Sequence, residues 1–99
     1  MDPRLISEAL VLWSGWHIKS WPDRDDERVI DRYGRDAALD LLPVIHRLAD
    51  EFYESDARYF AADLIEMGNQ AEDRFRGLHS ELTEEAVGAL GWCYTFDYR

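Results

Sequence analysis

The stretch DAALDLLPVIHRLADEFYE, residues 36–54, carries the most regular apolar pattern in the chain. Its apolar side chains recur at intervals of three and four residues, which places them on one face of an α-helix. They are Ala38, Leu41, Leu42, Ile45, Leu48, Ala49 and Phe52. Pro43 falls outside this face, where water can satisfy the carbonyl that loses its hydrogen bond. The pattern predicts one helix over 36–54, kinked at Pro43.

The same reasoning predicts four more helices on the two sides of this stretch. They span residues 3–15, 24–33, 57–77 and 84–95. Asp2 and Pro3 favour the start of the first helix, while Gly15 and Gly34 favour helix ends. We therefore predict an all-α fold, a single-domain bundle of four to five helices over residues 1–99.

The segment GWCYTFDYR, residues 91–99, fits two periods. Its aromatic residues share one face if the segment is a strand, but a strand needs a partner ladder. The only other candidate strand is WHIKSW, residues 16–21. We therefore favour a helix to about residue 95, followed by a few extended residues.

Charge and length limit the classes of function. The 99 residues carry a formal charge of −10, and 46% of them are hydrophobic. An acidic chain is repelled by nucleic-acid phosphates and anionic lipids, so we expect neither direct nucleic-acid binding nor membrane binding. The segment MDPRLISEALVLW, residues 1–13, lacks the basic region of an export signal, which predicts a cytoplasmic protein. Lys19 is the only lysine beside ten arginines, a composition typical of GC-rich bacterial genomes.

The acidic stretch SWPDRDDERVID, residues 20–31, resembles a calcium-binding loop only superficially. A calcium loop requires glycine at its sixth position and an acid at its twelfth, which here are Arg28 and Gly34. Acidic side chains at a helix start are favoured by the helix dipole. We interpret the stretch first as a helix beginning and second as an edge that could dock a basic surface.

The aromatic residues exceed what a bundle of this size encloses easily, since the chain has four Trp, five Tyr and four Phe. Exposed tryptophan beside acidic residues is typical of a protein contact surface. The predicted partner-binding residues are Trp16, Trp21, Asp23, Asp25, Asp26, Trp92 and Phe96. We expect a non-catalytic protein that acts through protein–protein interaction, either by self-association as a homo-oligomer or by binding a basic protein partner, with an inhibitor- or immunity-type role as one version.

The alternative is a small-ligand or metal-binding enzyme with a site between helices. His46, Asp50 and Glu54 follow one another at intervals of four and line one flank of the 36–54 helix. They are the only metal-ligand candidates, but the chain lacks the Glu-x-x-His step of carboxylate-bridged di-iron bundles. Cys93, between Trp92 and Tyr94, reads as a buried, inert thiol. No catalytic residue and no cofactor are predicted.

Overall fold

The computed structural model describes residues 1–99 as six helices without a strand. The helices are α1 (Pro3–Ser14), α2 (Asp26–Tyr33), α3 (Arg35–Phe52), α4 (Ala57–Phe60), α5 (Leu64–Leu78) and α6 (Glu84–Asp97). The predicted all-α bundle is therefore confirmed. None of the helices combines the length and the apolar composition that a membrane span requires.

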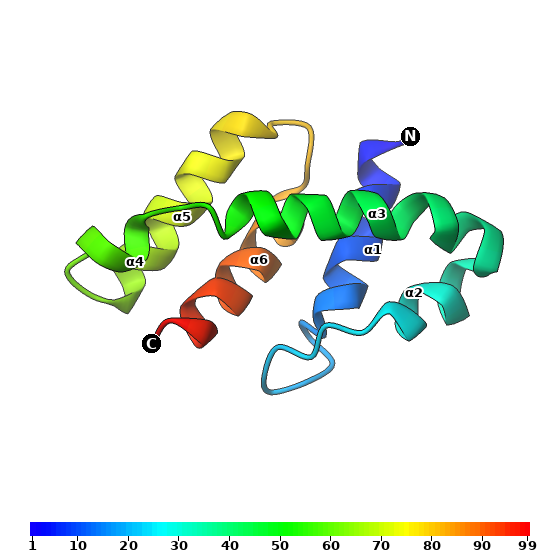
Figure 1. The fold of residues 1–99 in the computed structure, drawn as a ribbon, viewed down its shortest axis with the longest axis horizontal. Helices are drawn as coiled ribbons and strands as arrows, with labels where there is room; N and C mark the ends of the chain where they lie inside the picture. Colours follow the sequence, from blue (N-terminus) through cyan, green and yellow to red (C-terminus); the bar gives the residue numbers. More distant parts are fainter.

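The helix α3 lies across the bundle (Figure 1), in contact with α1, α5 and α6, while α2 folds back against α3. The buried positions of α3 are those that the sequence pattern predicts, with Leu42 partly exposed. The helix continues through Pro43, which is exposed. The kink predicted at this proline stays a prediction.

A single apolar core joins all the long helices. Its largest fully buried side chains are Leu10, Leu41, Ile45, Phe52, Phe75, Leu90 and Tyr94. The rings of Phe52, Phe75 and Tyr94 form tilted and edge-on contacts at centroid distances of 5.1 and 5.7 Å, the geometry that aromatic pairs prefer. The hydroxyl of Tyr94 donates to the Ser55 carbonyl and accepts from the Arg58 amide, so the polar end of this buried ring is satisfied by the chain segment before and at the start of α4.

The helix α6 has no polar side along most of its length. Seven of its residues are buried, namely Ala86, Val87, Ala89, Leu90, Gly91, Cys93 and Tyr94. At 100° per residue these positions cover roughly 200° of the circumference. The opposite side carries Trp92 and Phe96, which are half-buried. α6 must therefore be covered by several neighbours, and it packs on α5, α1 and α3.

The prediction of one helix over 57–77 is wrong, because the helix is interrupted at residues 61–63 and forms two helices, α4 and α5. The carboxylate of Asp63 accepts from the Glu66 amide at 2.8 Å, and Glu66 accepts from the Ala62 amide at 2.5 Å. These two bonds satisfy backbone donors at a new helix start. On either side of this break, Phe60 and Leu64 are 76% and 45% exposed.

Several other helix boundaries differ from the prediction by one or two residues, such as the end of the helix predicted over 36–54, which lies at Phe52. The helix expected from residue 24 begins at Asp26, because Asp25 caps it by accepting from the Glu27 amide at 2.9 Å. The helix expected to end near residue 95 continues to Asp97. The extended tail is thus wrong, since the last turn closes with a bond from the Tyr98 amide to the Tyr94 carbonyl.

The loop between α1 and α2 is held by Arg28. Its guanidinium donates to the carbonyls of Leu12 and Trp13 at 2.9 and 3.0 Å and also to the Asp23 carbonyl. A cation at this place satisfies the last carbonyls of α1 and complements the helix dipole. Arg28 therefore ties the loop at Asp23 to the C-terminal end of α1. Trp16, in the same loop, packs beside α6.

The junction of α2 and α3 depends on Gly34, which has φ 90° and ψ 161°. An L side chain rarely adopts this conformation, although the space around the residue is open. Gly77, by contrast, lies inside the last turn of α5 with open space around it and no positive φ.

We therefore predict opposite effects for the same substitution at these two glycines. Gly34→Ala should lower the free energy of unfolding by about 1–3 kcal/mol through backbone strain. Gly77→Ala should raise it by about 0.5–1 kcal/mol, because alanine favours the helix. Urea denaturation followed by circular dichroism measures both. Equal effects of the same sign would contradict the assigned backbone conformations.

Candidate functional site

A groove with a volume of about 590 Å³ lies between α5, α6 and the loop after α1. The loop supplies Trp16 and Ser20, and α5 supplies residues from its N-terminal half. The lining residues of the two helices are Leu64, Ile65, Gly68, Asn69 and Glu72 from α5 and Gly88, Gly91, Trp92, Thr95 and Phe96 from α6, with Arg99 at the edge. The groove thus lies along the side of α6 that the bundle leaves uncovered.

Three glycines form the floor of the groove, namely Gly68 on α5 and Gly88 and Gly91 on α6. Each leaves room for a group that packs directly against the helix backbone. A Cβ atom at Gly68 would lie 3.0 Å from the Thr95 methyl, so α5 and α6 approach each other closely at this glycine. A Cβ at Gly88 would lie 2.7 Å from the Trp16 ring, and one at Gly91 would collide with the Glu72 carboxylate. The indole and the carboxylate can therefore reach the floor only because α6 lacks side chains there.

Aromatic rings form one wall of the groove. The rings of Trp16 and Trp92 stack at 6.5 Å with an interplanar angle of 23°. Phe96 follows Trp92 by one helical turn, and the Arg99 guanidinium lies 4.1 Å from the centre of its ring. Trp16, Trp92 and Phe96 are each half-buried. Each of them therefore keeps part of its surface open to the groove.

The only carboxylate in the groove lining belongs to Glu72, whose side chain is 25% exposed. None of the side-chain hydrogen bonds in the structure involves it. Burial raises the pKa of Glu72 above its usual value, which the Arg76 guanidinium only partly offsets. Arg76 lies 3.7 Å from Glu72 but is held more closely by Asp73 at 2.6 Å and Glu84 at 2.8 Å.

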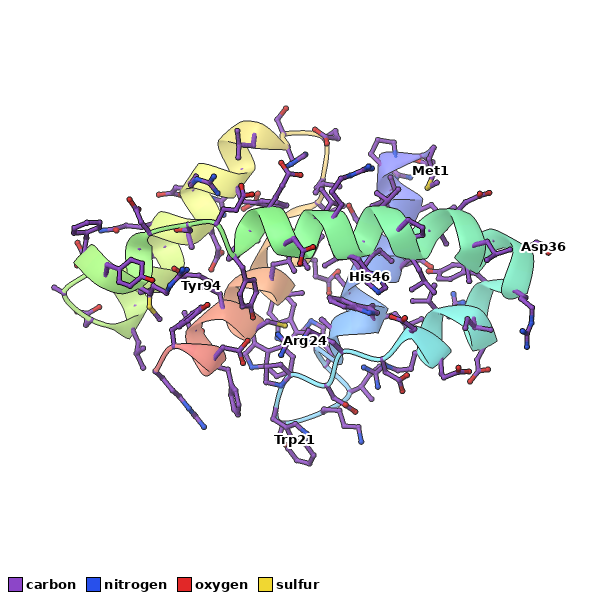
Figure 2. All side chains as sticks on the ribbon, viewed as in Figure 1. Met1, Trp21, Arg24, Asp36, His46 and Tyr94 are labelled. Atoms are coloured by element: carbon purple, nitrogen blue, oxygen red, sulfur yellow. The ribbon has the colours of Figure 1, made fainter.

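The predicted partner-binding residues fall into two groups. Trp16, Trp92 and Phe96 meet in the groove. Trp21 does not reach it, because it projects from the loop with 53% of its surface exposed (Figure 2). The Lys19 ammonium lies 5.7 Å from its ring.

The acidic residues of the loop form internal contacts. Asp23 and Asp25 pair with Arg28 at 3.4 and 3.7 Å. Asp26 accepts from the indole N–H of Trp13 at 2.9 Å and lies 2.8 Å from the His46 ring. Although burial acts to raise it, these two hydrogen bonds hold the pKa of Asp26 below its usual range. These carboxylates thus stabilise the loop and the start of α2.

His46, Asp50 and Glu54 are not brought together as a site. The His46 ring lies 2.8 Å from Asp26, whereas Glu54 pairs with Arg74 at 3.9 Å. No three His, Cys, Asp or Glu side chains lie close enough to one another to hold a metal ion.

A second polar cluster ties the loop to the ends of α3 and α6. The Tyr53 hydroxyl donates to Asp97 at 2.5 Å, and Arg24 donates to Asp97 at 3.0 Å and to the Tyr53 oxygen at 2.9 Å. Burial and the bond to Asp97 raise the pKa of Tyr53 far above its usual value. Burial likewise raises the pKa of the Cys93 thiol to about 11, so the thiol is protonated and weakly reactive at neutral pH.

Sequence reasoning missed Glu72, Gly88 and Gly91. The available signal was the pairing of small residues, Gly68 on one helix with Gly88 and Gly91 on the other, which allows two helices to approach closely. Comparison with protein-family models, with curated proteins and with solved structures finds no match for this chain.

The raised pKa of Glu72 has a consequence for stability. A carboxyl group whose pKa is higher in the folded protein stabilises the fold below its unfolded pKa, and this contribution is lost as the pH rises through the folded pKa. At pH 7 the ionised Glu72 therefore makes the fold less stable than a neutral side chain would.

We predict that Glu72→Gln raises the free energy of unfolding at pH 7 by up to about 1 kcal/mol. The gain should shrink as the pH is lowered towards 4, where Glu72 itself becomes neutral. Urea denaturation at several pH values measures this effect. Asp50→Asn, an exposed charge-matched control, should change stability little at either pH, and a loss of stability in Glu72→Gln would contradict the assigned environment.

Proposed function

We propose that this chain is a non-catalytic interaction module that binds a basic segment of a partner protein in the groove between α5 and α6. The observation that carries the proposal is the Glu72 carboxylate, which is partly buried in a groove lined by aromatic rings and has no hydrogen bond. An ionised group in such a place costs stability, and a cation from a partner would compensate it. The site thus favours a positively charged ligand.

Apolar surface continues from the groove onto the start of α5. Leu64 and Ile65 line the groove and are 45% and 77% exposed, and Tyr59 and Phe60 on α4 are 70% and 76% exposed. Clustered exposed apolar side chains mark interaction surfaces, and aromatic anchors carry much of the binding energy at interfaces. This surface supports a partner segment that combines basic and apolar side chains.

The overall charge favours a basic partner over a second copy of the chain. Two copies would each carry a formal charge of −10 and would repel each other as they approach. The same charge attracts a basic protein and accelerates its association, most strongly at low salt. We place no catalysis in the groove, because its lining offers Glu72 no histidine, cysteine or second acid as a partner.

Selection of random peptides against the immobilised protein tests this function. Enriched peptides should carry arginine or lysine next to aliphatic or aromatic residues. Trp92→Ala should weaken their binding about tenfold or more, because an aromatic anchor is lost. Fluorescence anisotropy with labelled peptides gives the affinities, and circular dichroism checks that the variant is folded.

Leu39→Ala is the matched control, since Leu39 is 70% exposed on α3 and is not part of the groove lining. It should leave peptide affinity unchanged. Enrichment of acidic or uncharged peptides, or equal effects of the two substitutions, would overturn the proposal. A dimer seen by light scattering and disrupted by Trp92→Ala would replace the basic partner by a second copy.

A further inference from the structure

We infer that the groove recognises one arginine side chain, with Glu72 as the acceptor and the rings of Trp16, Trp92 and Phe96 as the stacking surface. This inference rests on the proposed function and identifies the side chain that would anchor the partner.

The carboxylate of Glu72 has one long ion pair, with Arg76, and no hydrogen bond. The short contacts of Arg76 are with Asp73 and Glu84, and it lies 3.7 Å from Glu72. No ion pair joins Arg99 to Glu72, although both residues line the groove. A guanidinium from outside could therefore form charge-assisted hydrogen bonds with this carboxylate, which has no hydrogen bond in the structure and only the 3.7 Å ion pair with Arg76.

The aromatic wall already accepts a guanidinium in this structure. The Arg99 group lies 4.1 Å from the centre of the Phe96 ring, within the range of a cation–π contact. Trp92 lies one helical turn before Phe96 on α6, lines the same groove and stacks with Trp16. A planar guanidinium matches such faces better than a compact ammonium, which favours arginine over lysine.

The groove offers one ligand two kinds of contact. The glycines of α6 leave room for the carboxylate and the indole at the floor, since a Cβ at Gly91 would displace Glu72 and a Cβ at Gly88 would displace Trp16. A ligand in the groove can therefore meet both the Glu72 carboxylate and the aromatic rings that line it. Arginine combines an apolar stem, which can lie along the indoles, with a charged planar head.

Titration of the protein with capped single amino acids tests the inference by NMR. The probes are the Nα-acetyl methylamides of arginine, lysine and citrulline, the last being an uncharged analogue of arginine. The indole N–H signals of Trp16 and Trp92 should shift saturably with arginine. The signals of Trp13 and Trp21, which lie outside the groove, should stay in place and serve as internal controls. Lysine should bind about three- to tenfold more weakly, and citrulline should cause no saturable shift.

Glu72→Gln should weaken arginine binding about tenfold, whereas Asp50→Asn, which removes an equal charge outside the groove, should change it less than twofold. Equal shifts with citrulline and arginine, or unchanged affinity in Glu72→Gln, would overturn the inference.

The proposed function fails separately from this inference. The selected basic peptides could require Trp92 but bind equally well when citrulline replaces arginine, or when the protein carries Glu72→Gln. In that case the groove is an interaction site without an arginine pocket, and only the inference is lost. If no basic peptide is selected, the proposed function is lost, whatever the single amino acids do.

Discussion

The arrangement of this chain depends on α6, which is apolar on nearly all sides. A helix of this kind must be enclosed by its neighbours, yet a chain of 99 residues has few helices to supply. α5, α1 and α3 cover one side of α6, and the loop after α1 brings Trp16 to the edge of the other. The groove is the part of the α6 surface for which no cover is left.

Small residues convert this uncovered surface into a shaped site. Side chains larger than glycine at positions 68, 88 and 91 would separate α5 from α6 or displace the groups between them. Because α6 is bare at these points, an indole and a carboxylate lie directly on its backbone. The result places a negative charge where solvent is partly excluded, an arrangement that reduces stability and that a bound cation would offset.

The fold was largely predictable from the sequence because helical stripes report which side chains are buried. The break before α5 was missed because the apolar residues continue through it, although Asp63 followed by Glu66 is a helix-start signal. The site was harder to predict. Trp16 and Trp92 could be expected to be partly exposed, but the burial of Glu72 depends on a glycine of another helix, and periodicity within one helix carries no information about it.

The contacts among Arg24, Tyr53 and Asp97 join three segments that are far apart in the sequence. Detachment of the loop that carries Trp16 would therefore break both bonds of Arg24, while the bond from Tyr53 to Asp97 would still join the end of α3 to α6. The loop and the last turn of α6 thus share a contact, which couples local opening of the one to fraying of the other. The same turn carries Phe96 and is followed by Arg99, and both line the groove, so this contact also steadies the groove wall.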